Sequence, residues 1–134
     1  YSRLFTYGMR HVTQTVYYPS TVLALEGGKT LYCFNAGKVK NPSVTHLFAD
    51  SLESSSGEQF YRLIRCSTGI GMYACHRNKA NIHFADGHAK SSDTSEIGEI
   101  WKADRASWGS SGEGTFGDFH VFTALYTHRV LPAN

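Results

Sequence analysis

Histidine and aspartate side chains that could bind a metal gather in one segment of the chain, His76 to His88, with the sequence HRNKANIHFADGH. Nine residues separate His76 from the dipeptide Asp86-Gly87, and His88 follows that dipeptide directly. Asp50 adds a carboxylate at the end of an apolar run further upstream. Zinc accepts imidazole and carboxylate ligands, whereas calcium takes carboxylate and carbonyl oxygens. We therefore consider Asp50, His76, Asp86 and His88 a candidate site for a divalent metal, either zinc or calcium.

The dipeptide Asp86-Gly87 also has a purely structural interpretation. Asp-Gly between alternating apolar and polar residues is typical of a type I′ hairpin turn, because both central residues need a positive φ. A two-residue turn would pair Phe84 with Ala89 on the core face and bring His83 and His88 together on the other face. In this interpretation, the polar cluster is a hydrogen-bond network that ties the hairpin to the next strand.

The elements that must position these residues are mostly strands. Thirteen glycines and an aromatic share of 13% favour a strand-and-turn protein. The expected strands cover residues 21–25 (or a helix start capped by Ser20), 30–34, 44–49, 60–66, 81–85, 88–92 and 119–130. Ile97, Ile100 and Trp101 have helical spacing, which predicts a short helix within Thr94 to Asp104. The sequence therefore predicts an α+β fold, mainly antiparallel β-sheet with little helix, in one domain over residues 1–134.

The three cysteines, Cys33, Cys66 and Cys75, cannot all pair within one chain. A bridge between Cys66 and Cys75 is one arrangement, because the glycine-containing segment between them could turn back on itself. The alternative is that all three are small, buried, free thiols.

Composition and motifs exclude several classes of protein. A net charge of +2 gives no basic face for nucleic acid. No apolar run approaches the roughly 20 residues that span a bilayer. The sequence contains no nucleophile elbow, phosphate-binding loop or metalloprotease helix, and the adjacent Cys75-His76 pair alone makes no catalytic pair, so we do not expect an enzyme. The aromatic residues fill a core or form an exposed platform for sugar or protein; they include Tyr17, Tyr18, Trp101, Trp108, Phe119 and Tyr126.

Three segments, in this order, resemble the prepilin-type H-X9-DG family of pseudopilin-like proteins. The segments are Tyr7-Gly8-Met9; VKNPSVTHLFADS from Val39 to Ser51, in which Pro42-Ser43 leads into a strand that ends at Asp50-Ser51; and His76 with Asp86-Gly87 in the form FADGHAK. The resemblance covers about Tyr7 to Ser92 and leaves the residues from Asp93 onward largely unassigned.

The resemblance implies the globular head of a subunit in a type IV pilus-like or type II secretion pseudopilus-like fibre, which acts by self-assembly. Its antiparallel sheet would lie against a long N-terminal helix that these 134 residues lack, so Tyr1 would lie well inside the native protein. The implied partners are pilin-like subunits and secretion-machinery components. The implied location is periplasmic or at the cell surface, with an inner-membrane anchor before assembly. The alternative is a secreted β-rich module that binds carbohydrate or protein and shares only the hairpin.

Overall fold

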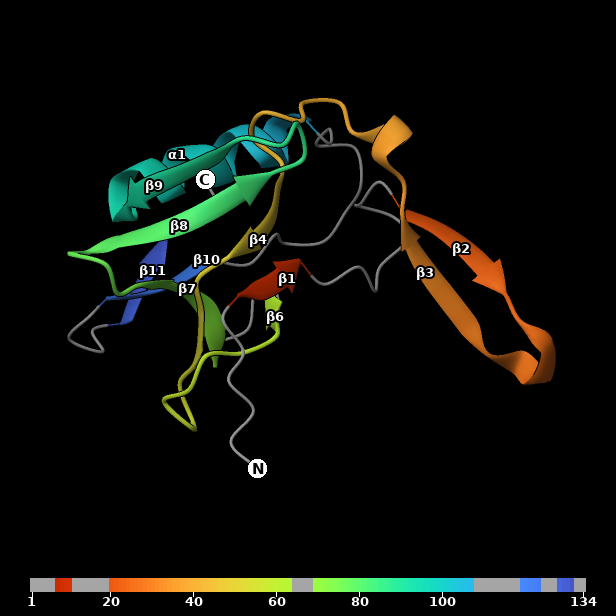
Figure 1. The fold of residues 1–134 in the computed structure, drawn as a ribbon, viewed down its shortest axis with the longest axis horizontal. Coiled ribbons are helices and arrows are strands. Elements are labelled where there is room, and N and C mark those ends of the chain that lie inside the picture. The colour runs from red at the N-terminus through yellow and green to blue at the C-terminus, as the bar shows by residue number, and fades with distance from the viewer. Residues whose placement is uncertain (1–6, 11–19, 64–68, 108–118, 124–127, 132–134) are drawn as a thin grey trace.

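The computed structural model of the chain describes residues 7–10, 20–63, 69–107, 119–123 and 128–131 (Figure 1). Within these ranges, most strand pairs are antiparallel and there is one α-helix. The protein is therefore an α+β fold that is mainly β-sheet, as the sequence predicts.

The larger sheet has five strands in the order β6-β1-β4-β8-β9. Their bounds are Arg62–Leu63, Gly8–Arg10, His46–Ala49, Lys79–Phe84 and Ala89–Asp93. All neighbours are antiparallel except β1 and β6. Strand β8 alternates as predicted, because Ala80, Ile82 and Phe84 are buried between more exposed residues.

The second sheet has four strands in the order β11-β10-β7-β5. Their bounds are His128–Leu131, Phe119–Thr123, Ile70–Ala74 and Ser51–Glu53. The single strand expected over 119–130 is thus two paired strands, and β10 also runs parallel to β7. The strand expected over 60–66 is observed only as β6, and residues 64–68 lie outside the described ranges.

Strands β2 (Ser20–Ala24) and β3 (Thr30–Phe34) form an antiparallel two-stranded arm. A short 3-10 helix, Glu26–Gly28, joins them, so residues 21–25 form a strand and not a helix start. Figure 1 shows the arm extending away from the two main sheets. Leu25 and Leu31 on the arm are exposed.

The hydrophobic core lies between the two main sheets and is closed by helix α1 (Thr94–Ser107). The sheets contribute Ile82, Phe84, Met72 and Val121, and the helix contributes Ile97 and Trp101. Trp101 is 3% exposed and therefore belongs to the core. Tyr17, Tyr18, Trp108 and Tyr126 lie outside the described residues, as does the side chain of Phe119.

A reciprocal capping box starts helix α1. The carboxylate of Asp93 accepts hydrogen bonds from the backbone N–H groups of Ser95 and Glu96, both at 2.9 Å. In return, the Glu96 carboxylate accepts a 3.0 Å hydrogen bond from the Asp93 N–H.

Among the described residues, no helix is long and apolar enough to cross a membrane.

The turn between β8 and β9 differs from the predicted two-residue turn. Phe84 N–H donates to His88 O at 2.9 Å, so three residues, Ala85 to Gly87, form the loop. Gly87 has a φ of 93°, whereas Asp86 does not have a positive φ. This is the hairpin loop in which a left-handed glycine follows a type I turn. The predicted type I′ turn is therefore wrong, although Gly87 supplies the left-handed residue.

This extra loop residue shifts the pairing by one position and separates the two histidines. His83 now lies opposite Ala89, and both are exposed. The His88 ring stacks on Phe84, with centroids 4.2 Å apart and planes 7° apart. The predicted contact between His83 and His88, and the predicted burial of Ala89, are therefore wrong.

Candidate metal centre

Asp50 lies where the chain passes from the larger sheet into the smaller one, between β4 and β5. Its backbone N–H donates to Asn81 O in β8 at 3.1 Å, and its carbonyl accepts from Tyr73 N–H in β7 at 2.9 Å. Asp50 therefore bonds to both β7 and β8 at the point where these strands, which Figure 1 shows diverging, join different sheets; we call this point the fork.

A tight turn between β7 and β8 brings two more polar residues to this fork. Arg77 and Asn78 have φ values of 54° and 63°. His76 and Lys79 exchange both backbone hydrogen bonds, at 3.0 and 3.1 Å. The two-residue loop with positive φ at both positions is the type I′ turn that the sequence led us to expect at Asp86-Gly87. It holds Cys75 and His76 beside Asp50.

The side chains of Asp50, Cys75 and His76 form a cluster, which we call the fork cluster. One ligand atom from each lies within 4.8 Å of the other two. The Asp50 Oδ2 atom is 3.5 Å from His76 Nε2 and accepts a 2.7 Å hydrogen bond from Asn81 N–H. The Asp50 side chain is only 3% exposed, whereas that of His76 is 58% exposed. The cluster thus reaches from the protein interior to solvent.

Burial controls the protonation of this cluster. Desolvation raises the pKa of Asp50 above its ordinary value, and the hydrogen bond from Asn81 and the charge of His76 only partly oppose that rise. Burial and the nearby Asp50 charge also raise the pKa of the Cys75 thiol. Without a bound cation, burial therefore favours the neutral forms of the Asp50 carboxyl and the Cys75 thiol more than water would.

The raised pKa of Asp50 predicts a specific pH dependence of stability. A carboxyl group with a raised folded-state pKa stabilises the fold below its unfolded value near 3.8 and loses that contribution as pH rises through the folded value. In chelator, Asp50→Asn should therefore gain stability relative to wild type as pH rises from near 3.8 through the raised folded-state pKa, and should keep that gain at higher pH. The relative gain should reach about 1.4 kcal/mol per unit of pKa elevation. Urea unfolding at several pH values measures it, and a pH-independent difference would contradict the prediction.

Asp86 and His88 form a separate pair at the opposite end of β8. The Asp86 Oδ1 atom is 2.6 Å from His88 Nδ1, and both side chains are substantially exposed. The hydrogen bond from the His88 side chain lowers the pKa of Asp86. The structure therefore divides the predicted four-residue site into two pairs. Asp50 and His76 lie together, with Cys75 as a third possible ligand beside them, whereas Asp86 and His88 lie apart from them.

Cys75 is a free thiol, so the bridge to Cys66 that the sequence allowed is not present. Cys66 itself lies outside the described residues, and Cys33 is also a free thiol. The adjacency of Cys75 and His76 was the available signal for Cys75 as a ligand.

The remaining motif residues shape the approach to Asp50. Pro42 and Ser43 occupy an exposed turn before β4. Val44 N–H and Thr45 N–H both donate to Asn41 O, at 3.3 and 3.2 Å. The Asn-Pro-Ser step therefore ends one segment and directs the chain into the strand that leads to Asp50, as the sequence predicts.

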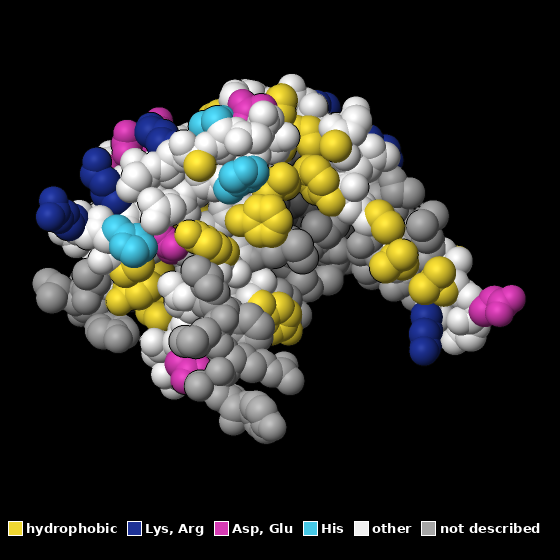
Figure 2. Space-filling model, viewed as in Figure 1, with side chains coloured by type: hydrophobic (Ala, Val, Ile, Leu, Met, Phe, Trp, Pro, Cys, Tyr) yellow, Lys and Arg dark blue, Asp and Glu magenta, His cyan; other side chains and the backbone are white. Residues whose placement is uncertain are grey.

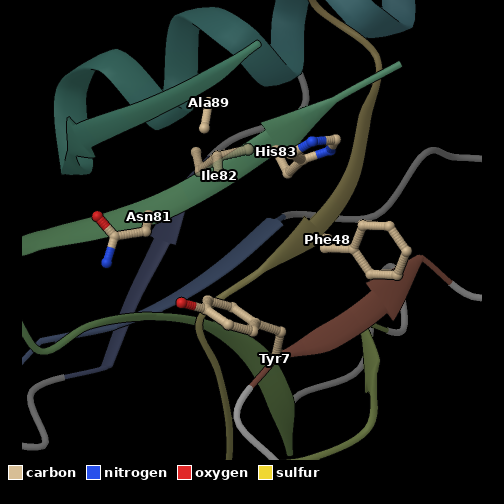
Figure 3. Close-up of a pocket in the computed structure, with 6 residues that line it drawn as sticks. All are labelled: Tyr7, Phe48, Asn81, Ile82, His83 and Ala89. Atoms are coloured by element: carbon tan, nitrogen blue, oxygen red, sulfur yellow. The ribbon is translucent and has the colours of Figure 1, made fainter. Parts of the chain in front are cut away.

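A second candidate site is a groove of about 320 Å³ on the larger sheet (Figure 3). It is lined by Tyr7, Phe48, Asn81, Ile82, His83 and Ala89. Tyr7 is 51% exposed and Phe48 is 40% exposed. The His83 ring meets Phe48 edge-on, with centroids 6.0 Å apart. Figure 2 shows hydrophobic side chains gathered on this face.

Comparisons of the chain with protein-family models, curated proteins and solved structures found no match. The resemblance of the chain to the H-X9-DG family therefore rests on the quoted segments alone.

Proposed function

We propose that this chain is the globular head of a pilin-like fibre subunit and acts by assembly, not by catalysis. The observation that supports this is the place of the H-X9-DG motif in the fold. His76 begins the turn before β8, and Asp86-Gly87 form the turn after it. The nine intervening residues are two turn residues (77–78), the six residues of β8 and one loop residue, Ala85. The spacing thus matches one strand framed by two tight turns.

The groove on the larger sheet gives the proposed head a surface for the N-terminal helix of a pilin-like subunit. Exposed rings of Tyr7 and Phe48 border an apolar floor that includes Ile82. Apolar rings on a sheet face are what a helix with an apolar stripe would cover. In this proposal, the subunit is anchored in the inner membrane before assembly, its head is periplasmic or extracellular, and its partners are other pilin-like subunits and secretion-machinery components.

The same groove supports a second candidate function, a secreted module that binds carbohydrate or protein. Two exposed aromatic rings beside the polar side chains of Asn81 and His83 are a surface on which a sugar could stack and form hydrogen bonds. This function predicts a ligand-dependent rise in melting temperature in a glycan screen, and that rise should be lost in Tyr7→Ala.

The fibre proposal predicts that the full reading frame encodes an apolar helix of roughly 20 residues upstream of Tyr1. It also predicts that this chain is recovered with fibres sheared from cells that express the full-length protein. Sequencing the gene and immunoblotting the sheared fraction provide the measurements. A frame with only a cleavable signal upstream, or a protein found only outside the sheared fraction, would reject the fibre and favour the binding module.

The proposal includes a divalent metal. Among the described residues, the fork cluster is the group of three side chains that could together hold a metal ion. We therefore infer that the ion binds there and not at the Asp86–His88 pair.

A further inference from the structure

We propose that the fork cluster binds an ion of the zinc class, with Asp50, Cys75 and His76 as its three protein ligands. The ion would link the β7–β8 turn to the junction between β4 and β5, and so connect the two sheets. This inference deepens the metal part of the proposed function and is independent of fibre assembly.

The spacing of the ligand atoms suits a tetrahedral ion. Zinc lies about 2.3 Å from sulfur and about 2.0–2.1 Å from nitrogen and oxygen, so tetrahedral ligands lie about 3.3–3.6 Å apart. The separation of His76 Nε2 and Asp50 Oδ2 is 3.5 Å, within that range. The other separations in the cluster are at most 4.8 Å, so an ion would draw the side chains slightly closer together.

The donor set selects the metal. Thiolate sulfur and imidazole nitrogen are ligands for zinc and similar transition metals, whereas calcium requires mostly oxygens. The Asp50 carboxylate and the Cys75 thiolate carry one negative charge each when bound, and neutral His76 adds none. A divalent ion would therefore cancel the charge of the cluster. This cancellation matters because Asp50 is buried, and a buried carboxylate needs an opposite charge beside it. His76, its partner at this site, carries a positive charge only when protonated.

The fold already holds the least mobile ligand in place. The backbone N–H of Asn81 donates to Asp50 Oδ2 at 2.7 Å, an orienting contact of the kind that supports metal-bound carboxylates. A carboxylate oxygen has a second lone pair, so Oδ2 can keep this hydrogen bond while it binds the ion. Three protein ligands leave a fourth position on the exposed side, near His76, which water would fill.

The test is calorimetric titration of the chelator-treated protein with zinc chloride, together with melting curves with and without zinc. We expect one zinc per chain. Cys75→Ser and His76→Ala should each weaken binding at least tenfold. Zinc at 100 times its dissociation constant should raise the melting temperature by about 5–10 °C. Cobalt chloride as a probe should give a sulfur-to-cobalt charge-transfer band that Cys75→Ser removes.

His88→Ala is the matched control, because it removes the other histidine that pairs with an aspartate and should leave zinc binding unchanged. Asp50→Asn tests the third ligand, but its burial makes misfolding a risk, so the two more exposed variants decide the outcome. Binding unaffected by Cys75→Ser and His76→Ala, tighter binding of calcium than of zinc, or no zinc uptake would each overturn the proposal. None of these results depends on the sheared-fibre assay, so the two proposals fail separately.

Discussion

Replacing Gly71 with alanine should lower the free energy of unfolding by about 3 kcal/mol or more, or prevent folding. Gly71 lies in β7, against the neighbouring parallel strand β10. A Cβ atom at Gly71 would overlap the carbonyl oxygen of His120 and lie 2.8 Å from its carbonyl carbon. Because these atoms are backbone, no side-chain rotation can relieve the overlap, and β7 and β10 would have to separate. Urea unfolding followed by circular dichroism measures the loss.

Gly37→Ala is the matched control for Gly71→Ala. A Cβ atom there would meet only the side-chain oxygen of Asn35, at 3.4 Å, an ordinary contact distance. Its effect on the free energy of unfolding should stay within about 0.5 kcal/mol. Equal effects of the two variants would show that the close approach of β10 to β7 is not a constraint on this fold.

Phe84→Ala should cost about 3–5 kcal/mol of stability, the range for removal of a fully buried aromatic side chain. Phe84 is 1% exposed, belongs to the core cluster and stacks on the ring of His88. Truncation would leave a cavity between the sheets and remove the surface that holds His88. Thermal and urea unfolding measure the cost.

Phe48→Ala is the control that shows whether the cost of Phe84→Ala comes from the burial of its ring. Phe48 lies on the neighbouring strand β4, but it is 40% exposed and borders the groove. We expect its loss to cost no more than about 1 kcal/mol. If the cost of Phe48→Ala equalled that of Phe84→Ala, the groove face would contribute to stability like a core and could not be a free binding surface.

Sequence patterns predict the fold well where apolar side chains recur with the period of a strand or a helix. The burial of Ile82 and Phe84 in β8 follows from alternation, and the helical spacing of Ile97 and Trp101 correctly placed both in α1. The register of the β8–β9 hairpin was wrong by one residue, because Asp86-Gly87 fits a two-residue and a three-residue loop equally well. Hydrogen bonding across the whole hairpin decides between them, and that information is not local.

Strand β7 was missed for a related reason. Gly69 and Gly71 flank Ile70, and glycines so close together are typical of a turn. In the structure Gly71 is a strand residue, because the backbone of β10 leaves no room for a side chain there. This requirement comes from a segment about fifty residues further along the chain, so no window around Gly71 contains it.

The candidate site was predicted in part for similar reasons. Asp50 stands out in the sequence because it ends an apolar run, and His76 because nine residues separate it from Asp86-Gly87. Cys75 does not, because the turn that places it beside Asp50 is formed by Arg77 and Asn78, without a glycine to indicate its geometry. Asp86 and His88 were included because they are near His76 in sequence, but a whole strand, β8, separates them from it in space.

The fork at Asp50 has a consequence for how the protein unfolds. The chain passes from one sheet to the other at Asp50 through a single residue, and returns across the four-residue turn from His76 to Lys79. Each sheet therefore contains strands that are direct continuations of strands in the other. Separation of the sheets would break the hydrogen bonds on both sides of Asp50 at once. The two sheets should behave as one cooperative unit, in contrast to the β2–β3 arm, whose strands, within the described part of the chain, pair only with each other.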